Sequence, residues 1–244
     1  MTIRVTSATA LRVLQQLRRD HRTLALIAIV PPALLTLLRY ILDAEQPAFQ
    51  RVAVPLVGMF PLIIMFLITS IAMLRERTSG TLERLMSLPL ARLDLIAGYA
   101  IAFALAAAVQ TCATSAVAFG LLGVTVHGST ALVVALAVAN ALLGVALGLF
   151  LSAFATSEFQ AVQFMPAVLL PQILLSGLFV PHGRMPYALR IAADALPLPY
   201  AFDALSRVGT GSQGGRLHLD VGVVLVTIVI AIVLGATTLR RRTT

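Results

Sequence analysis

The sequence contains no lysine and no tryptophan, and it has a single cysteine, Cys112. Without lysine the chain lacks the G-x-x-x-x-G-K-[ST] loop that binds ATP phosphates. One cysteine excludes a disulfide within the chain, and because Cys112 lies in an apolar run we interpret it as a packing residue. The H-E-x-x-H and G-x-S-x-G motifs are also absent, and the four histidines lie far apart. We therefore predict no catalytic residue, no metal site and no cofactor in this chain.

Charged residues are scarce as well. They make up 11% of the 244 residues, whereas 59% are hydrophobic, and a soluble domain carries about 25% charged residues. This composition indicates that lipid is the main solvent of the chain. The net charge of +8 comes entirely from arginine, and we interpret it as a signal of membrane orientation rather than of nucleic-acid binding.

Six apolar runs are long enough to cross a bilayer as helices, which takes about 20 residues each. They cover residues 24–42, 52–74, 95–124, 130–154, 159–180 and 221–239. The sequence thus predicts an all-α, multi-pass membrane protein with six transmembrane helices in a domain over residues 24–244, after an N-terminal segment over residues 1–23. No cleavable signal peptide is expected, because the first apolar run is too long for one.

The arginines orient the predicted bundle, because the cytoplasmic ends of membrane spans collect positive charge. If successive spans alternate in direction, one side carries Arg4, Arg12, Arg18, Arg19, Arg22, Arg75, Arg77, Arg84, Arg92, Arg240, Arg241 and Arg242. We therefore expect both termini to lie in the cytoplasm.

The stretch between the second and third runs, residues 75–94, is the most charged part of the chain. Three apolar residues recur there at helical spacing, between helix-start signals and a helix-stopping proline: Leu82, Leu85 and Met86, after Thr78, Ser79 and Gly80 and before Pro89. The pattern predicts a short amphipathic helix over residues 76–90 on the cytoplasmic face. A solvated connector between two spans fits the same pattern equally well.

Residues 8–20 form a second amphipathic pattern. Leu11, Leu14 and Leu17 lie on one helical stripe, opposite Arg12 and Arg18 and their polar neighbours. A helix that lies along the membrane surface is the natural interpretation.

Ionisable residues, which an ion-driven transporter carries inside its spans, are almost missing here. Arg39 lies near the end of a predicted span, where its side chain reaches the interface. Glu158 falls in the short turn between the fourth and fifth spans. A proton or sodium relay has no residues to use, so any energy for transport must come from another polypeptide.

A few uncharged polar residues do lie inside the spans. Gln110 and Thr114 continue a small-residue face of the third span, and Asn140 precedes Gly144 and Gly148 in the fourth. Such faces are typical of close helix packing, which we favour over contact with a transported molecule. In the fifth span Gln163 and Gln172 point to opposite sides at 100° per residue, so at least one of them faces a pathway or a partner.

The segment over residues 176–208 follows the fifth span. It contains two short amphipathic pieces separated by Pro197–Leu198–Pro199, and residues 209–215 form a Gly-rich link to the last span. A plain surface loop is possible, but the apolar content of both pieces indicates that the segment enters the membrane or caps the bundle.

Two stretches together resemble the membrane subunits of ABC-2 type exporters, the group that includes the daunorubicin-resistance-type permeases. They are ERTSGTLERLMSLPLARLDLIAGY and LLSGLFVPHGRMPYALRIAADALPLPYAFDALSR. The residues that carry the resemblance are Glu76, Gly80, Thr81, Leu82, Glu83, Pro89, Arg92 and Gly98 in the first, and Ser176, Gly177, Phe179, Pro181, Pro186, Pro197, Tyr200, Asp203 and Arg207 in the second. The chain departs from the family at His182–Gly183–Arg184, where small or apolar residues are more usual.

The resemblance implies the six-helix fold of type V exporters and a role for each stretch. The first cytoplasmic loop would be a coupling helix that docks on a separate ATP-binding subunit through Glu76, Arg77, Thr81, Leu82, Glu83, Arg84 and Leu85. Re-entrant helices over residues 176–208 would close the exit as an outer gate, with Phe179, Pro181, Pro186 and Tyr200. The family also implies two ATP-binding subunits, which hold ATP and Mg²⁺, and a second permease, identical or paralogous, with the pathway between the two permeases.

A pathway of apolar groups and a few amides suits lipophilic or amphiphilic cargo, so we expect export of a drug or a lipid. Export of a lipid-linked glycan or cell-wall precursor is the alternative on the same scaffold, and a non-transporting membrane anchor for an ATPase is a third possibility. Arginine without lysine, together with abundant alanine, is typical of a GC-rich bacterial genome. We therefore expect the bacterial plasma membrane.

Overall fold

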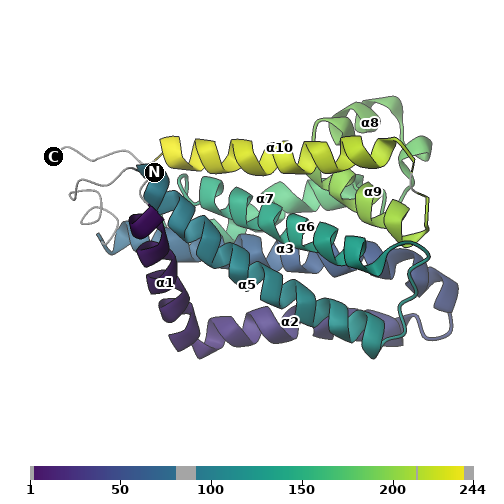
Figure 1. Ribbon diagram of the computed structural model, residues 1–244. Coiled ribbons are helices and arrows are strands. Elements are labelled where there is room, and N and C mark those ends of the chain that lie inside the picture. The colour runs from purple at the N-terminus through teal and green to yellow at the C-terminus, as the bar shows by residue number, and fades with distance from the viewer. Residues whose placement is uncertain (1–2, 81–91, 213, 239–244) are drawn as a thin grey trace.

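The computed structural model describes residues 3–80, 92–212 and 214–238, and every regular element within these ranges is a helix. In chain order they are α1 (Ile3–Arg19), α2 (His21–Ile41), α3 (Gln46–Thr78), α5 (Arg92–Gly120), α6 (Thr130–Leu151), α7 (Glu158–Leu175), the 3₁₀ turn η1 (His182–Arg184), α8 (Tyr187–Asp194), α9 (Pro197–Gly209) and α10 (Arg216–Thr237). Figure 1 shows these helices as one elongated bundle.

Six of these helices are long and apolar enough to cross a membrane: α2, α3, α5, α6, α7 and α10. They correspond in order to the six predicted spans, so the six-helix plan is confirmed. Several ends differ from the prediction. The fifth span ends at Leu175 rather than residue 180, because Ser176 caps the helix and Gly177 follows with a φ of +94°. A left-handed residue of this kind, usually glycine, commonly terminates a helix.

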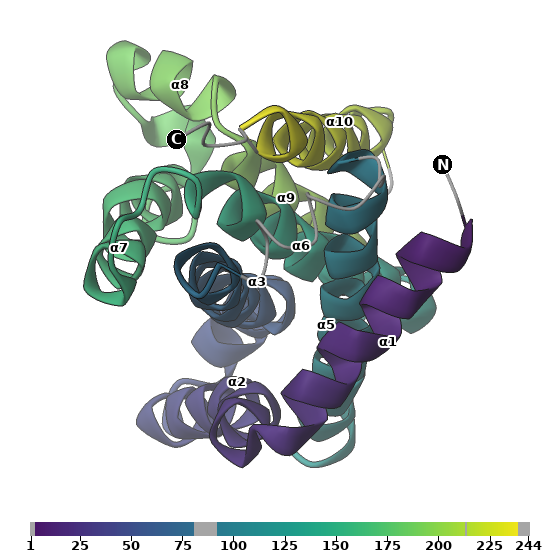
Figure 2. The same cartoon turned by 90° about the vertical axis from the view of Figure 1, so that its left-hand side faces the viewer.

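Helix α3 forms the centre of the bundle and contacts α2, α5, α6, α7 and α9 (Figure 2). It runs unbroken for 33 residues although it contains Pro55 and Pro61. Prolines inside membrane helices are tolerated when neighbouring helices pack around the freed backbone groups. At 1.5 Å per residue α3 is about 50 Å long, so it extends well beyond an apolar core of about 30 Å.

Two large apolar clusters, along with a small third one around Leu74 and Ala161, form the core of the described residues. One lies at the α1 end, where α1, the end of α3 and the start of α5 meet, and includes Met73, Ile96 and Tyr99. The other lies at the α9 end and includes Val57 and Leu205. The spans therefore have a packed core at both ends, and α1 and α9 each close one of them.

Helices α3 and α6 approach each other closely at two glycines. A Cβ atom on Gly144 would lie 2.2 Å from the carbonyl oxygen of Leu62, and one on Gly148 would lie 2.6 Å from that of Phe66. No side chain fits at these distances, so the G-x-x-x-G pattern of α6 allows direct backbone contact with α3.

Two short helices follow α7, as predicted, but the Pro197–Leu198–Pro199 stretch does not separate them. Pro197 is the first residue of α9, a position where proline is favoured because its missing N–H is not needed. Helix α9 is buried along most of its length, through Leu198, Ala201, Leu205 and Val208. It packs between α3, α6 and α10, whereas α8 remains mostly exposed (Figure 1).

Helix α1 begins earlier than the predicted segment over residues 8–20 and packs on the bundle through one face. Thr6, Thr9, Ala10 and Val13 are buried, whereas Leu11 is 60% exposed. Helix α1 packs against α5 at Gly98, where an added Cβ would lie 2.6 Å from Thr9 Cβ, and this contact leaves Leu11 of the predicted apolar stripe outside the bundle. Small residues at this contact decide which face of α1 is turned inward.

Candidate functional site

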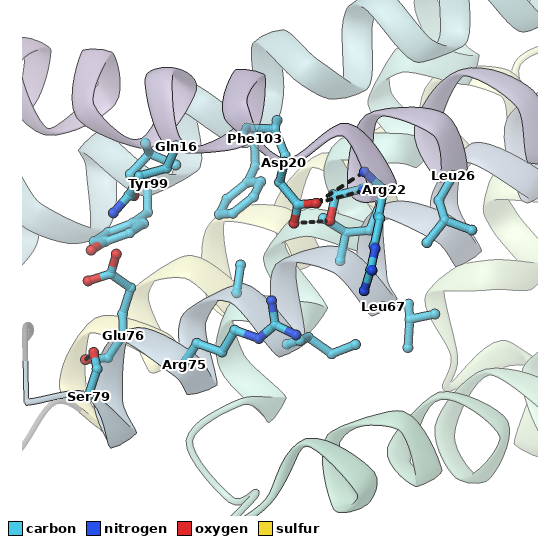
Figure 3. A pocket seen from close by; sticks show the side chains of 16 residues that line it. Gln16, Asp20, Arg22, Leu26, Leu67, Arg75, Glu76, Ser79, Tyr99 and Phe103 are labelled. Atoms are coloured by element: carbon cyan, nitrogen blue, oxygen red, sulfur yellow. Dashed lines mark hydrogen bonds between the residues drawn. The ribbon is translucent and has the colours of Figure 1, made fainter.

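A cavity lies at the α1 end, between α1, α2, α3 and α5. Its volume is about 650 Å³. Its lining combines charged side chains, among them Asp20, Arg22, Arg75 and Glu76, with apolar side chains such as Leu67 and Phe103 (Figure 3). The cavity is therefore amphiphilic and lies where the charged stretch after α3 begins.

Three helices are joined at one edge of this cavity by a buried polar contact. Arg12 of α1 lies with its Nη2 3.5 Å from Glu76 Oε2 of α3, and the same Nη2 donates a hydrogen bond to the hydroxyl of Tyr99 of α5. The Glu76 side chain is only 12% exposed. The Arg12 side chain is 31% exposed, so the contact is partly buried, and Arg12, Glu76 and Tyr99 together join the end of α3 to α1 and α5.

A second ion pair joins the same end of α3 to α7. Arg75 donates from Nε to Glu158 Oε1 at 2.7 Å and from Nη2 to Glu158 Oε2 at 3.0 Å. Both side chains are more than half exposed, so the pair adds little stability. Its two-pronged geometry nevertheless fixes the direction of α3 relative to α7.

Of the predicted coupling residues, the structure describes only Glu76 and Arg77. Both belong to the last turn of α3, not to a separate helix, because α3 continues to Thr78 and ends at the Ser79 cap. The predicted helix start at Thr78–Gly80 is thus the end of α3, and Gly80 has a φ of +70°. Thr81, Leu82, Glu83, Arg84 and Leu85 lie outside the described residues.

The predicted pathway residues have different surroundings. Asn140 donates to the Ala201 carbonyl at 3.4 Å, and Gln172 accepts from the Leu198 N–H at 3.4 Å, so both amides contact α9. Gln110 is 1% exposed, and neither atom of its amide has a hydrogen-bond partner among the described residues. Thr114 donates to the Gln110 carbonyl. The structure therefore does not bring these residues together in one site.

Gln163 lies on the outer surface of α7, opposite the buried Gln172. Its neighbours along the helix on that surface are apolar and exposed: Phe159, Val162, Leu170 and Leu174. The side-chain amide of Gln163 therefore has exposed apolar side chains before and after it along α7. It is the only predicted pathway residue with an exposed side chain.

The four predicted gate residues do not form a common site either. Phe179, Pro181 and Pro186 are exposed, and Tyr200 is half-buried with its hydroxyl bonded to the Asp194 carbonyl at 2.8 Å. His182 approaches Asp194 at 3.4 Å, so the sequence that departs from the family pattern lies against the end of α8. Among the described residues no three His, Cys, Asp or Glu side chains gather as a metal site.

A model of the ABC-2 type transporter family matches residues 5–208, from α1 through α9. The chain belongs to the ABC-2 type transporter family. It is a permease, the membrane subunit of an ABC transporter, and a multi-pass membrane protein.

Three relatives place the permease within this family. The probable multidrug ABC transporter permease YbhR of Escherichia coli is 28% identical over 153 residues, which are 63% of this chain and 42% of that protein. ABC transporter G family member 20 of Dictyostelium discoideum is 28% identical over 57% of this chain and 19% of its own. Nodulation protein J of Rhizobium leguminosarum bv. viciae is 30% identical over 96 residues, which are 39% of this chain and 37% of that protein. The matches thus span less than half of each relative.

Sequence reasoning missed several residues around the cavity of the permease. Tyr99 and Asp20 received no role, although both lie near the end of a span, and Arg12 was interpreted only as an orientation signal and as part of the polar side of an amphipathic helix. In the sequence Arg12 lies 64 residues from Glu76 and 87 residues from Tyr99, the two residues that it contacts. A pattern within one helix cannot reveal such pairs, and only the packing of α1 on α5 brings them together.

Asp20 caps the first turn of α2 at the cavity rim. It accepts a hydrogen bond from the Thr23 hydroxyl at 2.6 Å and from the backbone N–H groups of Thr23 and Arg22 at 3.1 and 3.2 Å. These donors, above all the two of Thr23, lower the pKa of Asp20 from its ordinary value. The cap therefore stabilises the folded permease above the unfolded-state pKa of about 4, and this contribution is lost as the pH falls through the lower folded pKa.

We expect the backbone amide of Thr23 to lose hydrogen-exchange protection as the pH falls from about 6 to about 3. Asp20→Asn can accept the two backbone bonds through its amide oxygen, loses the bond from the Thr23 hydroxyl, and does not titrate, so its protection should stay level over this range. Asp20→Ala should destabilise the helix start by about 1 kcal/mol at neutral pH. Hydrogen exchange read by mass spectrometry checks both. Equal pH profiles for the original chain and Asp20→Asn would contradict the assignment of this carboxylate.

Proposed function

We propose that this permease is the transport subunit of an ATP-driven exporter that moves lipophilic or amphiphilic cargo, a drug or a lipid, out across the bacterial plasma membrane. The relatives named as multidrug permeases support this cargo class. The scarcity of charged residues inside the spans supports an external energy source. We place the α1 end in the cytoplasm, because the arginines of α1 and of the end of α3 lie on that side.

The observation that carries the proposal is the way the end of α3 is held. The charged stretch after Thr78 joins α3 to α5, and the last turns of α3 are tied to α1 and α5 through Glu76 and to α7 through Arg75. A force applied to this stretch from the cytoplasm reaches four helices at once. Coupling of ATP hydrolysis to two packings of the bundle needs such a rigid connection.

The proposed unit contains two permeases, identical or paralogous, and two ATP-binding subunits, which hold ATP and Mg²⁺. The exposed surface of α7 supports a second permease or cargo at this face. Gln163 has no hydrogen-bond partner among the described residues and stands between apolar side chains. An amide is costly in contact with lipid, so we place α7 along the pathway between the permeases.

The test is to purify the permease together with its ATP-binding subunit and reconstitute the complex in lipid vesicles. ATP hydrolysis stimulated by lipophilic cations or short-chain lipids, with ATP-dependent accumulation of the same compound, is the expected result. A complex whose partner carries a substituted P-loop lysine is the control. Unstimulated hydrolysis without accumulation of any such compound would instead identify the chain as a membrane anchor for the ATPase.

Reversing the charges of Glu83 and Arg84 together should uncouple the two subunits. We expect ATP-dependent transport to fall by about tenfold or more, because a like charge replaces an attractive one at each contact with the partner. Folding should be retained, because both residues fall outside the spans predicted over residues 52–74 and 95–124. Transport in vesicles and the unfolding midpoint in detergent are the two measurements. Unchanged transport by the doubly reversed variant would remove these residues from the coupling contact.

A further inference from the structure

The cavity between α1, α2 and α3 is placed at the depth of lipid headgroups. Helix α2 has 21 residues and is therefore about 31 Å long, which matches a bilayer core of about 30 Å. Arg22 and Thr23 begin this helix and line the cavity. Arg22 at the start of α2 thus lies at the membrane boundary, and Leu67, which comes eight residues before Arg75 in α3, lies deeper along the bundle.

The carboxylates at the cavity already have partners inside the protein. Glu76 is paired with Arg12, and Asp20 accepts three hydrogen bonds from the first turn of α2. They consequently have little capacity left to attract a cation. The cavity is therefore poorly suited to bind a positively charged ligand.

The arginines retain unused hydrogen-bond donors. Within the described residues the guanidinium of Arg22 has no hydrogen-bond or ion-pair partner. Arg75 binds Glu158 through Nε and Nη2, which leaves Nη1 available. Figure 3 shows both side chains extending into the cavity, Arg22 from α2 and Arg75 from α3. Two guanidinium groups on opposite walls are well suited to bind the oxygen atoms of a phosphate.

The rest of the cavity is suited to hydrocarbon. Leu67, Ile71 and Phe103 line its inner part, and Leu26, which also lines it, is 47% exposed on the outer side of α2. An acyl chain that enters beside Leu26 would extend from the surrounding lipid into the cavity. The volume of about 650 Å³ is in the range of pockets for drug-sized ligands, enough for a headgroup and the first part of a lipid tail.

We propose that this cavity binds a glycerophospholipid of the adjacent leaflet, with the phosphodiester between Arg22 and Arg75 and an acyl chain against Leu67. A bound lipid would contact α1, α2 and α3 together, next to the Arg12–Glu76 pair. The site is independent of the exported cargo, and it rests on the cavity itself rather than on the proposed function.

Because the chain has no tryptophan, a single Leu67→Trp substitution provides a fluorescent reporter inside the cavity. The purified full-length chain in detergent is titrated with a phospholipid brominated in its acyl chain, and separately with the diacylglycerol that carries the same chains. Bromine quenches tryptophan only at short range. We expect half-maximal quenching by the phospholipid at a mole fraction about fivefold lower than by the diacylglycerol, because only the phospholipid offers charge-assisted hydrogen bonds.

Two further substitutions control the result. Arg22→Gln in the Leu67→Trp background should abolish the fivefold preference, whereas Arg18→Gln, which removes the same charge from the exposed face of α1 outside the cavity, should preserve it. Val229→Trp reports on the lipid-facing side of α10, where Val229 is 61% exposed. This reporter should be quenched equally by both lipids, which shows that both lipids reach the surface of the protein to the same extent.

Three outcomes would overturn the proposal. Equal quenching of the Leu67→Trp reporter by the two lipids would mean that the phosphate is not recognised. An unchanged preference after Arg22→Gln would mean that the lipid lies elsewhere. Displacement of the brominated phospholipid by inorganic phosphate alone would identify the cavity as a site for a free anion.

Discussion

Replacing Gly144 with alanine should destabilise the permease by about 1–3 kcal/mol, the cost of overfilling a packed contact. The new methyl group would lie 2.2 Å from the carbonyl oxygen of Leu62 and 3.0 Å from its Cα atom. Both atoms belong to the backbone of α3, so no side-chain rotation relieves the clash. Helices α3 and α6 must move apart, and α3 is the centre of the bundle. We expect a lower unfolding midpoint in detergent, followed by far-ultraviolet circular dichroism.

Gly222 provides a matched control for this substitution. It lies in α10, and a Cβ atom added there meets nothing within 4 Å. Gly222→Ala should leave the stability unchanged or raise it by up to about 1 kcal/mol, because alanine favours the helix over glycine. If Gly144→Ala and Gly222→Ala had equal unfolding midpoints, the close contact of α3 with α6 would not exist in the folded permease.

Reversing the charge of either Arg12 or Glu76 should impair the permease far more than reversing both. Arg12→Glu places two carboxylates beside Tyr99, and Glu76→Arg places two guanidinium groups there. Arg12 is 31% exposed and Glu76 12% exposed, so the repulsion is only partly screened and should cost about 1–3 kcal/mol. The double variant Arg12→Glu with Glu76→Arg restores opposite charges. It should recover most of this loss in a double-mutant cycle of unfolding.

Transport should follow the same pattern if these residues pass the motion of α3 to α1 and α5. We expect each single reversal to reduce ATP-dependent transport by about tenfold, and the double variant to recover it at least in part. The pair Arg39–Asp43 is the matched control, because it has the same charges at 2.7 Å but lies at the other end of α2, with Asp43 71% exposed. Reversing Asp43 should change stability by no more than about 0.5 kcal/mol. Additive effects of the Arg12 and Glu76 reversals would show that the two residues do not act as a pair.

The six spans could be predicted because hydropathy is a property of each segment alone. A run such as residues 130–154 must leave water whatever its neighbours are, and α6 begins at residue 130 as expected. The ends of helices were harder to predict. Threonine, serine and glycine are found at both the starts and the ends of helices. In this chain Thr78, Ser79 and Gly80 lie at the end of α3.

The candidate site could be predicted only in part. The charged stretch after α3 indicated a contact outside the membrane, but the residues that hold α3 in place come from α1, α5 and α7. Arg12 was assigned to a polar surface of α1, and instead its side chain reaches Glu76 and Tyr99. Gln172 and Asn140 were candidates for a pathway, and both contact α9. A polar residue in a span shows that it needs a partner but not which partner it has.

The sequence by itself indicated that the permease lies in lipid, that it is built of helices, and which family it resembles. Composition, apolar run length and two local motifs each depend on residues close together in the chain, so no knowledge of packing was needed. The tertiary structure alone decided which face of α1 is buried, where Gly144 meets α3, and that a cavity with two arginines opens beside α2. These features arise where segments distant in sequence approach within a few ångströms, and there side-chain size and backbone geometry, not hydropathy, decide what fits.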